Sequence, residues 1–131
     1  MFKSLMIAAA ITIPLSTGGA FAGGHEPKAP IQMAATDSGK VYTDANGMTL
    51  YTFDKDTKGM SNCNDGCAVK WPPLMADAKA EDKDPFSIIT RADGSKQWAV
   101  NGMPLYTWIK DKQSGDVTGD GVKGVWHVAK P

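Results

Sequence analysis

The sequence predicts a mainly β fold: a small antiparallel β domain built from two tandem repeats of about 55 residues with pseudo-twofold symmetry. The first observation behind this prediction is that the segment 46–56 returns as 101–111, at an offset of 101 − 46 = 55. The same offset relates Trp71 to Trp126 without a gap. The second observation is that an Asn-Gly pair occurs at the same place in each copy, where it favours a tight hairpin turn.

The first 22 residues have the features of a secretory signal peptide. Lys3 supplies a positive charge, 5–15 is an apolar run, and Ala20 and Ala22 are small residues at the positions that signal peptidase recognises. The apolar run is too short for a transmembrane helix, and no later segment is apolar enough to be one. No cysteine lies at the cleavage point to carry a lipid. We therefore expect a periplasmic or secreted protein that starts at Gly23.

The mature chain of 131 − 22 = 109 residues is long enough for one domain. Removing Lys3 leaves 14 − 1 = 13 basic residues against 14 acidic ones, a formal charge of −1. This balance provides no attraction to nucleic acid or to an anionic membrane. We expect a flexible N-terminal tail at 23–36 and the two-repeat domain at 37–131. The repeats themselves are expected at 37–75 and 92–130.

Each repeat is predicted to open with a hairpin whose turn is Asn46-Gly47 or Asn101-Gly102. Asn and Gly tolerate the positive φ angles of a type I′ turn. The predicted strands are 40–43, 48–53, 96–100 and 103–109. Pro104 has no N–H for a ladder, so its strand should start there or lie at a sheet edge. A single helical turn is expected, over 65–70.

Both repeats carry the pattern Y-x-(F/W/Y)-x-x-D and later a tryptophan. The residues are Tyr51, Phe53, Asp56 and Trp71 in the first repeat, and Tyr106, Trp108, Asp111 and Trp126 in the second. With these motifs the chain resembles the bacterial "secreted repeat of unknown function" family, described as predicted lipoproteins with a Yx(FWY)xxD motif. The resemblance implies export and two repeats, and it brings no established activity. The chain departs from the description because it lacks a cysteine for lipidation.

The predicted mature N-terminus, Gly23-Gly24-His25, is a candidate metal site. A free α-amine, two deprotonated backbone amides and an imidazole nitrogen at the third position can bind Cu(II) or Ni(II) in a square plane. The alternative interpretation is a flexible tail that contains a histidine by chance.

Cys63 and Cys67 are expected to form a disulfide, because paired cysteines in exported proteins usually do and the residues between them favour a turn. Two alternatives remain open. The thiolates could bind Cu(I), with His127 as a third ligand if the fold brings it near, or they could form a redox-active dithiol.

No catalytic motif appears in the sequence, so we expect a protein that is not an enzyme. The leading hypothesis is that the protein binds or handles copper outside the cytoplasm. The second is a cell-envelope module that binds a ligand or partner, or serves a structural role, through its aromatic residues, for example by stacking on sugars. The third is thiol-disulfide chemistry. The alternative interpretation is that the aromatic residues serve only to pack the core.

Overall fold

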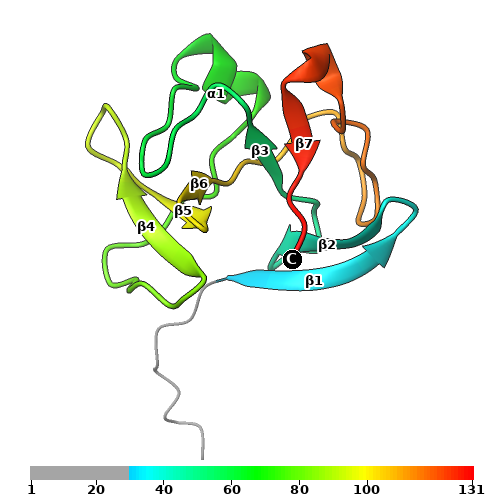
Figure 1. Cartoon of the computed structure of the whole chain (residues 1–131), viewed down its shortest axis with the longest axis horizontal. Helices are drawn as coiled ribbons and strands as arrows, with labels where there is room; N and C mark the ends of the chain where they lie inside the picture. Colours follow the sequence, from blue (N-terminus) through cyan, green and yellow to red (C-terminus); the bar gives the residue numbers. More distant parts are fainter. Residues whose placement is uncertain (1–29) are drawn as a thin grey trace, which may run out of the picture.

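Short antiparallel strands separated by turns build the part of the chain that the computed structural model describes, residues 30–131 (Figure 1). The strands are β1 Ile31–Thr36, β2 Gly39–Asp44, β3 Tyr51–Phe53, β4 Phe86–Thr90, β5 Lys96–Val100, β6 Met103–Pro104 and β7 Trp126–Val128. They form three small sheets, β1-β2, β3-β7 and β4-β5-β6. The helix α1 covers Gly66–Lys70, and the 3-10 helix η2 covers Val122–Gly124. The mainly β fold is therefore confirmed.

Each repeat begins one strand earlier than predicted. The residues 31–36, expected to be part of a flexible tail, form β1 and pair with β2 along their whole length. Its counterpart β4 pairs with β5 and precedes the predicted start of the second repeat. The strand β1 was not predicted because its side chains are small, half-buried or exposed, so the segment shows little hydrophobic alternation. Backbone hydrogen bonds to β2, rather than burial of apolar side chains, stabilise this strand.

The two Asn-Gly turns differ in conformation. In the second repeat Asn101 and Gly102 have φ angles of 52° and 84°, as the predicted type I′ turn requires. In the first repeat only Gly47 has a positive φ, so the type I′ prediction is wrong there. The reason is Asp44, whose carboxylate accepts the backbone N–H groups of Asn46 and Met48, both at 2.9 Å, and so stabilises a different turn.

The strand that ends each hairpin is shorter than expected. Only Tyr51–Phe53 of the predicted 48–53 and Met103–Pro104 of the predicted 103–109 are regular strand. Pro104 lies in the edge strand β6, as predicted. The helical turn expected at 65–70 is present as α1, whereas η2 was not expected.

The two repeats meet at a pair of tyrosines on the pseudo-twofold axis. The backbone N–H of Tyr51 donates to the carbonyl oxygen of Tyr106 at 2.8 Å, and the reverse bond measures 3.0 Å. Their side chains then cross between the repeats. The Tyr51 hydroxyl donates to Asp111 Oδ2 at 2.7 Å, and the Tyr106 hydroxyl donates to Asp56 Oδ2 at 2.6 Å. The tyrosine of each sequence motif therefore binds the aspartate of the other motif.

Both crossed pairs are buried, and burial changes the pKa of both tyrosines and of Asp56. Tyr51 and Tyr106 expose none of their surface. Burial raises the pKa of both hydroxyls far above the usual value of 10, and the neighbouring carboxylates raise it further. Burial also raises the pKa of the Asp56 carboxyl, against the opposing effect of the Tyr106 hydrogen bond. The tyrosines are therefore kept neutral, as hydrogen-bond donors.

Gly119 lies where the aromatic core leaves no room for a side chain. A Cβ atom at this position would lie 2.8 Å from Trp71 Cη2 and 3.0 Å from Tyr51 Cε2. The Gly119 N–H also donates to the Tyr51 hydroxyl at 3.1 Å. The glycine thus permits close packing of the loop before η2 against both rings.

We predict that stability falls at alkaline pH because of the two buried tyrosines. In the unfolded chain they ionise near pH 10. Above that pH the unfolded state binds fewer protons than the folded state, so the free energy of unfolding decreases as pH rises, by about 1.4 kcal/mol per pH unit for each tyrosine. Urea unfolding between pH 8 and pH 11 should show a shallower decrease for Tyr51→Phe. Tyr42→Phe is the control, because the Tyr42 hydroxyl makes no hydrogen bond within residues 30–131. Equal slopes in all three proteins would contradict the prediction.

A matched pair of glycine substitutions tests the core packing. Gly119→Ala should lower the free energy of unfolding by about 2 kcal/mol, because the methyl group forces the two rings apart. Gly66→Ala should raise it by about 0.5 kcal/mol, because the position is helical and nothing lies within 4 Å of the added atom. Chemical denaturation measures both, and similar values for the two variants would rule out the close packing at Gly119.

Candidate functional site

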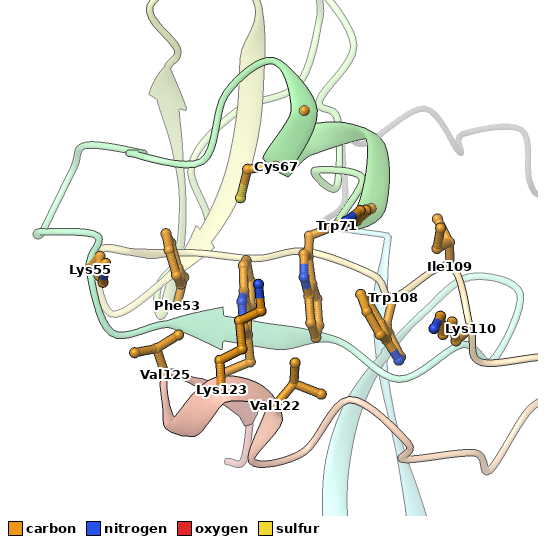
Figure 2. A pocket seen from close by; sticks show the side chains of 13 residues that line it. Phe53, Lys55, Cys67, Trp71, Trp108, Ile109, Lys110, Val122, Lys123 and Val125 are labelled. Atoms are coloured by element: carbon orange, nitrogen blue, oxygen red, sulfur yellow. The ribbon is translucent and has the colours of Figure 1, made fainter.

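Four aromatic rings stack in one continuous row across the junction of the repeats. The row runs Phe53, Trp126, Trp71, Trp108, with centroid separations of 4.2, 3.8 and 3.9 Å. The two central rings are nearly parallel, with an interplanar angle of 3°. Figure 2 shows Phe53, Trp71 and Trp108 standing side by side. All four belong to the repeated motifs singled out in the sequence.

The row obeys the same pseudo-twofold symmetry as the fold. Phe53 corresponds to Trp108, and Trp71 corresponds to Trp126, each at the offset of 55. The axis therefore passes between the two central tryptophans. Alternation in β3 places Phe53 on the same side as Tyr51, whose ring meets Trp71 edge to face at 5.4 Å. The Tyr106 ring meets Trp126 in the same way at 5.2 Å. The crossed tyrosines thus support the row from within the core.

A groove of about 730 Å³ runs along the row. Its floor consists of the four rings, and helices α1 and η2 form opposite walls (Figure 2). The groove is lined by Phe53, Lys55, Gly66, Cys67, Lys70, Trp71, Trp108, Ile109, Lys110, Val122, Lys123, Val125 and Trp126. Both repeats contribute to the floor and to the walls.

Hydrogen bonds and the disulfide hold both walls in place. In the first wall, Cys67 of α1 is bonded to the fully buried Cys63. The buried Arg91 guanidinium donates to the Cys63 carbonyl oxygen at 2.6 Å and so fixes the preceding loop. In the second wall, the carbonyl oxygen of Val125 accepts the N–H of Asp54 at 2.8 Å, which ties η2 to the end of β3. The groove is therefore a preformed feature of the fold.

All the charged residues that line the groove are positively charged. Four of its lining residues are lysines, all exposed, and none is an aspartate or glutamate. In the described part of the chain, 30–131, the one ion pair between side chains joins His127 and Asp54. The four ammonium groups therefore face solvent without a carboxylate partner there. Lys110 lies 5.9 Å from the centroid of the Trp108 ring, a cation–π distance.

The residues predicted as metal ligands do not form a site in the described chain. Gly23, Gly24 and His25 lie outside residues 30–131, and the proposed N-terminal site stays a prediction. Cys63 and Cys67 form the predicted disulfide, with Cα atoms 5.2 Å apart, so they provide no thiolate. His127 Nε2 lies 2.8 Å from Asp54 Oδ2. Within residues 30–131 no group of three His, Cys, Asp or Glu side chains is placed to hold a metal ion.

The aromatic residues of the motif pack mainly against one another, as the core interpretation expects. Phe53, Trp71 and Trp126 expose less than a tenth of their surface. The faces of the central rings are covered by their neighbours, so those rings present edges to the groove rather than free faces. A sugar-stacking platform requires a free face, and this alternative loses its support for the central rings.

The lysines and the second wall of the groove were not predicted from the sequence. Lys55 and Lys110 lie within the motif at equivalent positions, directly before its aspartate, which was a detectable signal. Lys123, Val122 and Val125 gave no signal, because η2 has only three residues and Lys123 has a φ angle of 54° inside it. Without that element the groove could not be anticipated.

Comparison with known proteins identifies one family. The model for "secreted repeat of unknown function" matches residues 32–75 and 87–130, more than half of the chain. Both matches begin near the first strand of a repeat, in agreement with β1 and β4 rather than with the later starts predicted from the sequence.

Searches of curated proteins and of solved structures found no match. Neither helix within residues 30–131 is long and apolar enough to cross a lipid bilayer. The two matched repeats, the paired Y-x-(F/W)-x-x-D motifs and the β fold lead to one conclusion: the chain belongs to the family of secreted repeats of unknown function.

Proposed function

We propose that this chain is a non-enzymatic binding module of the cell envelope and that the groove between the repeats is its ligand site. The observation that carries the proposal is the groove itself, with its floor of four aromatic rings and its two walls, one from each repeat. The predicted signal peptide at 1–22 and the secreted family support a location outside the cytoplasm, periplasmic or secreted.

The size and the lining of the groove suit a small organic ligand. A volume of about 730 Å³ lies within the range of about 300–1,000 Å³ that is usual for small-molecule sites. Aromatic and aliphatic side chains supply the apolar surface, and ammonium groups supply polar contacts. A purely structural contact between repeats would have no need for an open groove with unpaired charges.

The chemistry of the lining favours binding over catalysis. The side chains of the groove supply ammonium groups, a disulfide, indoles and hydrocarbon, with no carboxylate, imidazole or hydroxyl group among them. General acids and bases are most often imidazoles or carboxylates, and neither kind of group lines the groove. The full burial of Cys63 argues equally for a structural disulfide rather than thiol-disulfide exchange.

An uncharged fluorescent probe tests the proposed site. N-phenyl-1-naphthylamine should bind at one molecule per chain and quench the tryptophans of the floor. Ile109→Ala should weaken the probe about fivefold, because it removes apolar contact from the groove. Met33→Ala is the matched control, since Met33 is similarly exposed, at 56% against 49% for Ile109, and lies outside the groove. Absence of saturable binding, or equal weakening by both substitutions, would disprove the groove as the site.

Copper binding is a second candidate function, favoured by the sequence Gly23-Gly24-His25 after the predicted cleavage point. Native intact mass of protein recovered from an exporting host should show a chain that starts at Gly23 and retains one added Cu(II) ion. His25→Ala should abolish retention because it removes the imidazole ligand, whereas His127→Ala should not. A different N-terminus, or copper retained by the His25→Ala protein, would eliminate the N-terminal site.

A further inference from the structure

We infer that the groove selects a small amphiphilic anion, a molecule with a flat apolar body and a carboxylate, sulfonate or phosphate group. This inference rests on the proposed function and adds the chemical class of the ligand. It depends on the way in which the groove separates apolar surface from positive charge.

The floor determines the shape of the apolar part of the ligand. The four rings form one row and present their edges along it, and Val122 and Val125 of η2 extend the apolar surface on one side. Ring edges carry the positive part of the aromatic quadrupole, which attracts the electron-rich face of a flat aromatic body. An elongated flat molecule lying along the row would therefore make the greatest contact.

The rim determines the charge of the ligand. Lys55 lies at the Phe53 end of the row and Lys110 at the Trp108 end, while Lys123 reaches over the middle from η2 (Figure 2). Lys70 belongs to the opposite wall, α1. An anionic group therefore meets an ammonium group at either end and at both walls. No carboxylate lines the groove to repel an anion or to attract a cation.

This local charge is not a consequence of the overall composition. The whole chain has equal numbers of basic and acidic residues, 14 of each, yet the groove has four lysines and no acid. Two of the four, Lys55 and Lys110, are related by the repeat, so the charge recurs with the aromatic motif. The concentration of one sign beside an apolar floor is the arrangement that an amphiphilic anion complements.

A pair of probes with one ring system tests the inference. 8-Anilinonaphthalene-1-sulfonate is the sulfonated form of N-phenyl-1-naphthylamine, so the two molecules differ chiefly by one negative charge. We expect the sulfonate to bind the mature folded protein about tenfold more tightly than the neutral probe at low salt. At 1 M NaCl, where the Debye length is about 3 Å, the difference should fall to about twofold or less.

Lysine substitutions locate the source of the selectivity. Lys55→Gln combined with Lys110→Gln should weaken the sulfonate about fivefold more than it weakens the neutral probe. Lys40→Gln combined with Lys79→Gln is the control, because these lysines are exposed and lie outside the groove. Near-ultraviolet circular dichroism confirms that each variant keeps its aromatic packing, since the sulfonate also binds partly unfolded chains.

The outcomes separate this inference from the proposed function. If the neutral probe binds in the groove and the sulfonate binds no better, the anion selectivity is wrong and the binding groove stands. If neither probe binds at one site per chain, both proposals fail. If the two pairs of lysine substitutions weaken the sulfonate equally, the selectivity does not come from the groove and the inference is overturned.

Discussion

The crossed hydrogen bonds between Tyr51 and Asp111, and between Tyr106 and Asp56, are the constraint on which the rest of the structure depends. Each bond joins one repeat to the other at the Oδ2 atom of an aspartate, whereas the Oδ1 atoms accept hydrogen bonds within their own repeats, from Asn62 and Thr118. A buried carboxylate oxygen without a donor would be costly, and each tyrosine supplies the donor for the Oδ2 atom in the opposite repeat. The same tyrosine rings support the central tryptophans edge to face. The two copies of the motif are thus hydrogen-bonded to each other and hold the repeats together.

The position of the aromatic floor of the groove follows from these crossed hydrogen bonds. Once Tyr51 and Tyr106 are paired on the axis, Trp71 and Trp126 are brought together, and Phe53 and Trp108 extend the row at its two ends. The walls differ more than the floor: α1 is a disulfide-bonded helix, whereas η2 is a short 3-10 turn rich in glycine. Symmetry therefore provides the aromatic floor of the groove, whereas the two walls depart from the symmetry and are chemically distinct. A ligand would meet Lys70 on one wall and Lys123 on the other.

Errors in prediction arose where hydrogen bonds to the backbone outweighed the hydrophobic pattern or the usual turn preference of the sequence. The strand β1 has few large apolar residues and is stabilised by its ladder with β2, which composition does not reveal. The Asn46-Gly47 turn departs from its expected type because the Asp44 carboxylate accepts hydrogen bonds from the backbone N–H groups of Asn46 and Met48. By contrast, the disulfide, α1 and the edge position of Pro104 were predictable, because each depends on residues close in sequence.

The repeat, its period, the mainly β fold, the motif residues and the disulfide could be predicted from the residues alone, because they are identities at fixed spacing or pairs close in sequence. The packing of the repeats establishes that each tyrosine binds the aspartate of the other repeat rather than its own. It also decided that four rings form one row and that four lysines surround it. These facts depend on contacts between residues far apart in the sequence, from Trp71 and Trp108 (108 − 71 = 37 positions) to Phe53 and Trp126 (126 − 53 = 73 positions). Spacing along the chain does not specify which of two equivalent partners a side chain meets, because that choice belongs to the packing of the repeats.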